Sequence, residues 1–167
     1  TENHESIFFN KNAGLYFLLQ LNQPDIDKKI IAVMNFFSDR GIGGDVSSGK
    51  GQFDIEIKED IKLFSEPKNA NSFVTLSLYY PNKNELNNFK EGSVWYEQIK
   101  RKGKIESAFV PFTDIWKESV LMFKEGSTFP LIEEIKHYGK NPVVKENPFA
   151  VQQYGYAFPV RMVMRDV

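Results

Sequence analysis

The chain has 167 residues, 41% of them hydrophobic and 26% charged, which suffices for one folded domain with a sizeable core. It has no cysteine, which excludes disulfide bonds and thiolate metal sites and is typical of a cytoplasmic protein. It also has no run of about 18 apolar residues that would span a membrane. The net charge of −1 excludes a protein that is basic throughout, so we expect any nucleic-acid surface to be local.

The first predicted elements are a strand and a helix. Residues 14–21 are apolar on both faces, which predicts a central strand. The sequence Asn-Gln-Pro-Asp at residues 22–25 then predicts the start of a helix that ends near Arg40, at Gly41. Apolar residues at helical spacing predict one buried stripe on this helix. They are Ile26, Ile30, Val33, Met34 and Phe37.

A glycine-rich loop at residues 41–51 follows the helix and precedes two further strands. Residues 53–58 alternate between apolar and polar side chains, and residues 72–80 predict a second strand. The order of strand, helix, loop, strand and strand is the first half of a ferredoxin-like unit. We therefore predict an α+β domain with an antiparallel sheet, and the 15 phenylalanines predict a Phe-rich core.

The second half holds a basic segment and more strands. Residues 100–103 form a basic, hairpin-like segment between strand signals at residues 94–99 and 104–107. A short strand is expected at residues 119–123. A final strand at residues 154–164 contains Pro159, which predicts that it lies at a sheet edge or is bent.

The glycine loop is the strongest functional signal in the chain. Glycines permit positive φ and close approach of a ligand, and consecutive backbone N–H groups can form a concave anion site. Ser47 and Ser48 add hydroxyl groups and Lys50 adds a positive charge, so the loop suits phosphate better than a plain flexible connector.

A nucleotide-binding P-loop is a close but incomplete match to this segment. Residues 44–50 fit the first seven positions of the motif, but Gly51 replaces the hydroxyl residue that coordinates Mg²⁺. A P-loop also runs from a strand to a helix, whereas this loop runs from a helix to a strand. Both observations argue against ATP or GTP binding.

The loop and its flanking segments resemble a known family. Gly41-Ile-Gly-Gly, followed by Ser47-Ser-Gly, Gly51 and Phe53, is similar to the glycine-rich signature of RAMP-superfamily CRISPR proteins. Residues 14–17, 96–107, 122–127 and 154–158 resemble the C-terminal part of subunit four of the type III-A (Csm) effector complex. The resemblance implies a ferredoxin-like (RRM-like) RAMP domain at residues 14–167, with additional C-terminal strands. Residues 1–13 would cross from an N-terminal half that precedes this domain.

The resemblance also implies a function and partners. Such a subunit is non-catalytic, holds the 5′ handle of the CRISPR RNA (crRNA), binds the large polymerase-like subunit and contacts a backbone RAMP subunit. The positions that match the family's RNA contacts are Gly43, Gly44, Ser47, Ser48, Gly49 and Lys50. By charge alone we add Arg40, Lys100, Arg101 and Lys102. Where the family often has basic residues, this chain has Asp45 and Val46.

Catalytic chemistry has little support in the sequence. The two histidines, His4 and His137, are isolated, and the adjacent carboxylates have the pattern of a solvated face. We expect no metal or cofactor, and we expect Trp95 and Trp116 in the core or at a partner interface. Two alternatives stay open: a RAMP endoribonuclease that processes CRISPR repeat RNA, and an α+β domain that binds a small molecule, which would suit the acidic pI of about 6.1.

Overall fold

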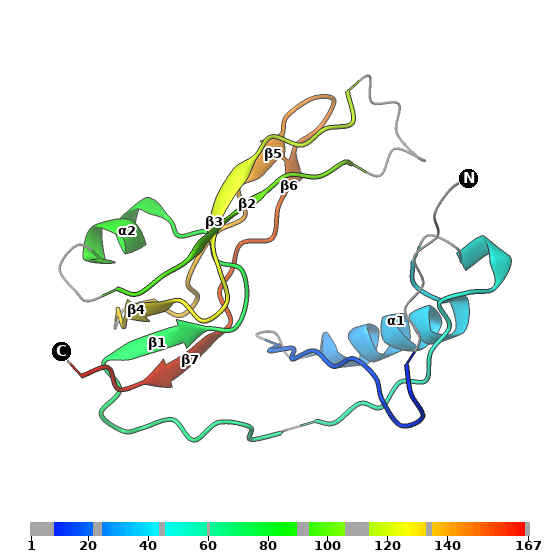
Figure 1. Ribbon diagram of the computed structural model, residues 1–167, viewed down its shortest axis with the longest axis horizontal. Helices are drawn as coiled ribbons and strands as arrows, with labels where there is room; N and C mark the ends of the chain where they lie inside the picture. Colours follow the sequence, from blue (N-terminus) through cyan, green and yellow to red (C-terminus); the bar gives the residue numbers. More distant parts are fainter. Residues whose placement is uncertain are drawn as a thin grey trace. The chain divides into compact units, whose positions relative to one another are not determined.

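The computed structural model describes residues 9–21, 25–43, 46–59, 61–89, 94–105, 114–132 and 135–165 (Figure 1). The chain divides into two compact units, Thr1–Ile61 and Lys62–Val167. In these residues helices are few and every strand pair is antiparallel, which confirms the predicted α+β class and is consistent with a RAMP ferredoxin-like fold. None of the described helices is long and apolar enough to cross a membrane.

The first unit contains α1 (Asp27–Arg40) and a short 3₁₀ helix, η1 (Val46–Ser48). Asp27 in the first turn and Arg40 in the last turn complement the helix dipole. The helix ends where predicted, at Gly41, which adopts a φ of 94° and donates its N–H to the carbonyl oxygen of Phe37 at 2.8 Å. Glycine adopts this backbone conformation without a steric penalty.

Three predictions for the first unit are wrong in this structure. Residues 14–21 and 53–58 form no β-ladder, and Leu15 and Tyr16 are 89% and 88% exposed. The predicted apolar stripe of α1 is also not buried, since no residue of the helix is buried. The physical reason is shared: the two segments do not pair into a sheet, so the described residues of this unit offer no sheet face that could cover the helix.

The second unit is built on a three-stranded antiparallel sheet of order β4-β1-β7. Its strands are β1 (Ser72–Thr75), β4 (Thr128–Pro130) and β7 (Pro159–Met162). Pro159 is the first residue of an edge strand, where its missing N–H is tolerated, as the sequence predicts. Phe73 in the central strand pairs with Phe129 on one side and Arg161 on the other.

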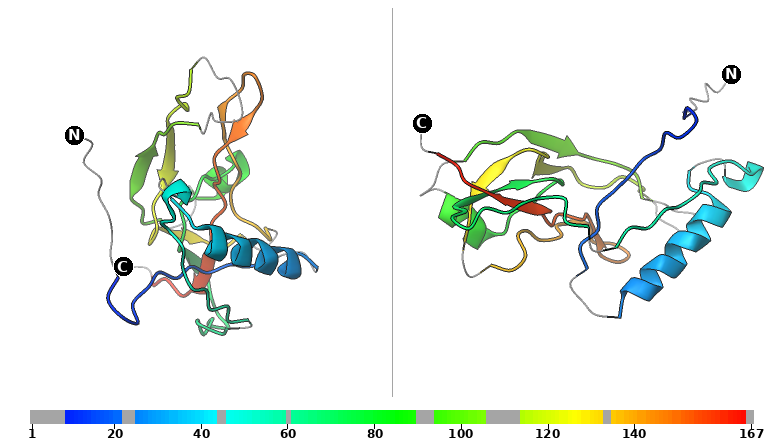
Figure 2. Two further views of the ribbon diagram at one scale, coloured as in Figure 1. Left: turned by 90° about the vertical axis from the view of Figure 1, so that its right-hand side faces the viewer. Right: turned by 90° about the horizontal axis from the view of Figure 1, so that it is seen from below.

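The described residues of this unit also form two further strand pairs and one helix. Strand β2 pairs with β3, and β5 pairs with β6, while α2 precedes β2 in the chain (Figures 1 and 2). Their bounds are α2 Lys83–Phe89, β2 Gln98–Arg101, β3 Val120–Phe123, β5 Val143–Lys145 and β6 Val151–Gln152. The amide of Glu118 donates to the carbonyl oxygen of Val144 at 2.7 Å, so β5 lies beside the start of β3.

The core of the second unit is an aromatic cluster, which confirms the predicted Phe-rich core. Phe73, Tyr79 and Phe129 are fully buried, and the ring centroids of Phe73 and Tyr138 are 4.2 Å apart. Phe89 of α2 and Phe123 of β3 also belong to the cluster. Buried aromatic pairs of this kind add to the stabilisation from burial, so the rings connect α2 and β3 to the central sheet.

A buried carboxylate fixes α2 to this core. Glu85 is fully buried, and its two oxygens accept hydrogen bonds from the Tyr79 hydroxyl at 3.0 Å, the Asn82 N–H at 2.7 Å and the Gly139 N–H at 2.8 Å. The Asn82 side chain in turn accepts the Glu85 N–H at 3.0 Å, which makes a reciprocal helix cap. Burial and the nearby Glu85 carboxylate raise the pKa of Tyr79 far above its usual value.

Candidate nucleic-acid interface

The predicted basic hairpin at residues 100–103 is wrong in its local structure. Lys100 and Arg101 lie in strand β2, where they pair with Leu121 and Val120 of β3. The residues that follow β2 also pair with a segment that the sequence did not indicate, since Lys104 pairs with Trp116. The cationic side chains at residues 100, 102 and 104 alternate, which is the spacing of one strand face rather than of a turn.

We call residues 98–105 and 114–118 the basic arm. Residues 103–105 run antiparallel to residues 115–117, and residues 98–101 pair with β3. It carries five cations, Lys100, Arg101, Lys102, Lys104 and Lys117, and two acidic residues, Asp114 and Glu118. All of the cations are exposed except Lys117, which is half-buried. In a chain of net charge −1, the arm therefore carries a local surplus of positive charge, with five cations against two carboxylates.

The basic arm contains a bulge. Arg101 pairs with Val120 and Lys104 pairs with Trp116, so two residues lie between these pairs on one strand and three lie between them on the other. Such an extra residue interrupts the ladder and changes the direction of neighbouring side chains, and bulges are frequent beside functional sites.

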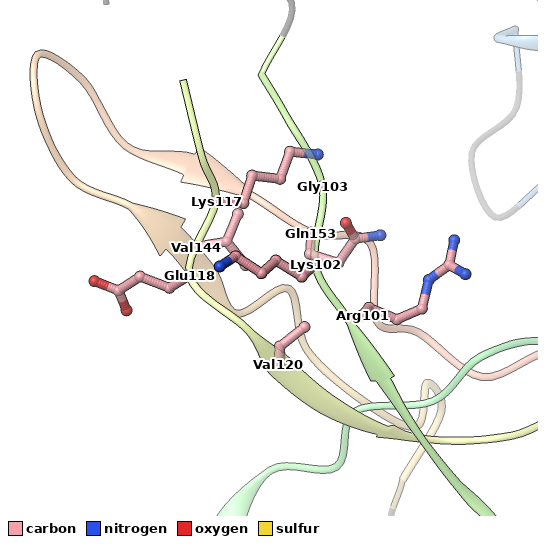
Figure 3. Close-up of a pocket in the computed structure, with 8 residues that line it drawn as sticks. All are labelled: Arg101, Lys102, Gly103, Lys117, Glu118, Val120, Val144 and Gln153. Atoms are coloured by element: carbon pink, nitrogen blue, oxygen red, sulfur yellow. The ribbon is translucent and has the colours of Figure 1, made fainter. Parts of the chain in front are cut away.

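A pocket of about 110 Å³ lies at this bulge (Figure 3). Its apolar wall is formed by Val120 and Val144, which are 9% and 2% exposed. Polar residues and Gly103, on the strand opposite the extra residue, complete the lining. They are Arg101, Lys102, Gly103, Lys117, Glu118 and Gln153. Three cations against one carboxylate give the pocket a surplus of positive charge, which favours an anionic group.

The glycine loop of the first unit is closed at its base. The amide of Ile42 donates to the carbonyl oxygen of Gly51 at 2.9 Å, and Gly41 and Gly51 leave no room for a side chain. A β-carbon on Gly41 would lie 2.7 Å from the carbonyl oxygen of Lys50. Glycine is therefore required at these two positions, because the two backbone segments at the base of the loop lie too close together for a side chain.

The tip of the loop is different. Gly43 and Gly49 have φ values of 124° and 78°, but open space surrounds the position of a β-carbon at each. The Gly49 N–H donates to the carbonyl oxygen of Val46 at 3.0 Å, so this amide is used within the loop. The loop therefore leaves space for a ligand at Gly49, but the Gly49 N–H is already engaged and does not serve as a hydrogen-bond donor to that ligand.

The predicted contact residues are distributed over both units. Arg40, Gly43, Ser47, Ser48, Gly49 and Lys50 are exposed on the first unit, and Gly44 lies outside the described residues. Lys100, Arg101 and Lys102 are exposed on the second unit. The guanidinium carbon of Arg40 lies 5.8 Å from the centroid of the Phe36 ring.

Sequence reasoning missed three members of the basic arm: Lys104, Lys117 and Trp116. The period-two spacing of the lysines at residues 100, 102 and 104 is the signal that could have identified a charged strand face. Lys117 and Trp116 carry no such signal, because their place beside residues 103 and 104 depends on pairing between segments that are separated in the sequence.

The sequence also offers candidate metal ligands and two histidines, in addition to the cations. The residues that the structure describes contain no group of three or more His, Asp or Glu side chains that could hold a metal ion. His137 is exposed, and His4 lies outside the described residues.

The match to a known protein family lies within the second unit. Residues 68–162, which include the described part of the basic arm, match the model of the CRISPR Csm4 C-terminal domain. The chain belongs to this family. The predicted relationship to subunit four of the Csm complex is thereby confirmed, while the glycine loop lies before the matched residues.

Two curated relatives carry the name "CRISPR system Cms protein Csm4". The one from Methanocaldococcus jannaschii is 30% identical over 135 residues, which cover 75% of this chain and 34% of the relative. The one from Thermococcus onnurineus is 35% identical over 79 residues, which cover 47% of this chain and 26% of the relative. The chain thus spans about a third or less of the length of these Csm4 proteins.

Proposed function

We propose that this chain is part of a non-catalytic Csm4 subunit of a type III CRISPR effector complex and that it binds the 5′ handle of the crRNA. The names of the relatives support the effector complex. The single observation that supports RNA binding is the concentration of five cations on the basic arm of a chain whose net charge is −1. Phosphate contacts by lysine and arginine supply most of the sequence-independent affinity for nucleic acid.

The glycine loop supplies a second, separate contact in this proposal. Its base is closed beside Lys50, and the space at its tip allows a phosphate backbone to approach Gly43 and Gly49. The same subunit would dock the large polymerase-like subunit and a backbone RAMP subunit, as the family resemblance implies.

The proposal is tested by purifying the full-length subunit with its partner subunits and sequencing the RNA that co-purifies. We expect enrichment of RNA that begins with the repeat-derived handle. Binding to this RNA should weaken as the salt concentration rises. Lys100→Glu should weaken it further, whereas Lys83→Glu, on the exposed side of α2, is the matched change of charge and should have little effect.

The alternative of a RAMP endoribonuclease is distinguished by incubating the protein with repeat RNA. The proposal expects the RNA to remain intact. Site-specific cleavage that His137→Ala abolishes would replace the binding function by the nuclease function. Equal losses of RNA affinity in Lys100→Glu and Lys83→Glu would show that the basic arm does not contact the RNA.

A further inference from the structure

Trp116 is an exposed aromatic residue among the cations of the basic arm. It is 48% exposed, and the side-chain nitrogens of Lys104 and Lys102 lie 5.0 Å and 5.3 Å from the centroid of its ring. Trp95 is also exposed, at 61%, but no lysine or arginine lies over its ring in the described part of the chain. Trp116 therefore differs from an ordinary exposed tryptophan in its electrostatic surroundings.

Hydrogen bonds hold both polar groups of the Trp116 backbone, the N–H and the carbonyl oxygen. Its N–H donates to Oδ1 of Asp114 at 3.0 Å, and its carbonyl oxygen accepts from Nζ of Lys145 at 3.2 Å. The same Nζ pairs with Oδ2 of Asp114 at 2.9 Å, and the Lys145 side chain is only 16% exposed. A ligand that binds the ring would therefore meet a pre-positioned backbone, which reduces the entropy lost on binding.

We propose that Trp116 is a stacking platform for one unpaired nucleobase of the bound RNA, and that Lys102 and Lys104 bind the adjacent phosphates. The inference rests on the proposed function, because it assigns a base-binding subsite to the same arm. Aromatic rings within a basic groove are the common means of holding single-stranded nucleic acid.

The two lysines can leave the ring without losing their favourable surroundings. An exposed cation–π contact is worth about 2- to 5-fold in an equilibrium constant, whereas stacking of a base on an aromatic ring is worth about 5- to 150-fold. A base therefore displaces the ammonium groups from the ring face. Each ammonium group then finds a phosphate close by, because phosphates flank every base.

The bulge pocket continues the same surface. Lys102 contacts the Trp116 ring and also lines the pocket, so the two features share this residue. Arg101 and Lys117 extend the cations along the pocket. A phosphate backbone that leaves the stacked base can follow this line.

The charges of the arm favour nucleic acid over a protein partner. One of its two acidic residues, Asp114, is already engaged with Lys145, which leaves Glu118 against five cations. A partner surface would need to be strongly acidic and to present a flat group to the indole ring. Single-stranded RNA satisfies both requirements at once.

These 167 residues contain two tryptophans, so each can be made the sole fluorescent reporter once any tryptophan of the full-length subunit outside them is replaced by phenylalanine. Trp95→Phe leaves Trp116 and Trp116→Phe leaves Trp95. We would titrate both variants of the full-length subunit with a short single-stranded RNA of mixed sequence and with inorganic polyphosphate, which lacks bases. Stacking predicts that RNA quenches Trp116, that polyphosphate does not, and that Trp95 is unaffected by either.

The affinity for the same RNA gives an independent measure. Trp116→Leu should weaken binding about 5- to 150-fold, Trp116→Tyr should restore most of it, and Trp95→Leu should leave it unchanged. If Trp116→Leu has no effect while Lys100→Glu weakens binding, the platform is wrong and the proposed RNA-binding function stands. If the wild-type subunit shows no RNA binding, both are wrong. Loss of a protein partner with unchanged RNA affinity would assign Trp116 to a protein interface instead.

Discussion

The backbones of Ile42 and Gly51 lie directly against each other and close the glycine loop. The Ile42 N–H donates to the Gly51 carbonyl oxygen at 2.9 Å, and a β-carbon on Gly51 would clash with the carbonyl group of Ile42. Gly51 also has a φ of 81°, so it must be glycine for reasons of both space and conformation. Gly49, at the tip, needs glycine only for its conformation.

Gly51→Ala should open the base of the loop. The positive φ alone costs roughly 1–2 kcal/mol for a residue with a β-carbon, and the clash with Ile42 adds to this cost. We expect faster hydrogen exchange at the Ile42 amide, measured by NMR. Gly49→Ala is the matched control, because it carries the same conformational cost without the clash. Equal protection of Ile42 in the two variants would contradict the role given to Gly51.

The second unit follows its sequence more closely than the first. The strand predicted at residues 119–123 is realised as β3, and Pro159 starts an edge strand. These elements are stabilised by nearby aromatic partners, such as Phe123 against Phe129. Residues 14–21 have an equally strong strand pattern but no pairing partner among the described residues of the first unit, and alternation or apolarity cannot reveal a missing partner.

Only those parts of the candidate site that are rich in positive charge or in glycine could be predicted from the sequence. Lys100, Arg101 and Lys102 were identified by charge, but their place in a strand follows from pairing with β3. Trp116 could not be recognised as part of the same surface, because its contact with Lys104 joins segments that are distant in the sequence. The glycine loop stays a prediction as an RNA contact.

Glu85→Gln should destabilise the second unit. The carboxylate accepts three hydrogen bonds, one of them from the Gly139 N–H. An amide oxygen can replace only one carboxylate oxygen, and the NH₂ group then faces a donor. We expect a loss of about 1–3 kcal/mol in the free energy of unfolding, measured with urea. Glu125→Gln makes the same substitution at an exposed position and should change the free energy of unfolding little. An equal loss of stability in this control would mean that the hydrogen bonds of Glu85 are not the cause.

The stability of the second unit should fall at high pH through Tyr79. Its pKa is raised in the folded protein, first by burial and then by Glu85. An unfolded tyrosine releases its proton near pH 10, whereas folded Tyr79 keeps it, so the native state binds more protons above that pH. The contribution is fully present below pH 10 and is lost above it, by about 1.4 kcal/mol per pH unit.

The measurement is the pH dependence of urea unfolding from pH 8 to 11. Tyr79→Phe should reduce the slope above pH 10, whatever its effect on stability at neutral pH. Tyr96→Phe, at a 57% exposed tyrosine, serves as the control and should leave the slope as in the wild type. The same slope in all three proteins would show that Tyr79 ionises equally in the folded and unfolded states.

Acid should release Trp116 from its fixed position. The pKa of Asp114 is lowered, first by the hydrogen bond from the Trp116 N–H and then by Lys145. A depressed pKa means that the contribution of this carboxylate is present above its unfolded value, near 4, and is lost as the pH falls through the folded value. In the Trp95→Phe background, the fluorescence of Trp116 should therefore change below about pH 4, while far-UV circular dichroism confirms that the fold persists.

Adding Lys145→Met to this background should move the fluorescence transition to higher pH, because the carboxylate loses its cationic partner. Lys136→Met, which removes an exposed lysine elsewhere in the unit, should leave the transition in place. The double variant should also bind RNA more weakly, because the ring is then less well positioned for a base. A transition that Lys145→Met does not move would mean that Asp114 holds Trp116 without help from Lys145, and the ion pair would have no part in preparing the platform.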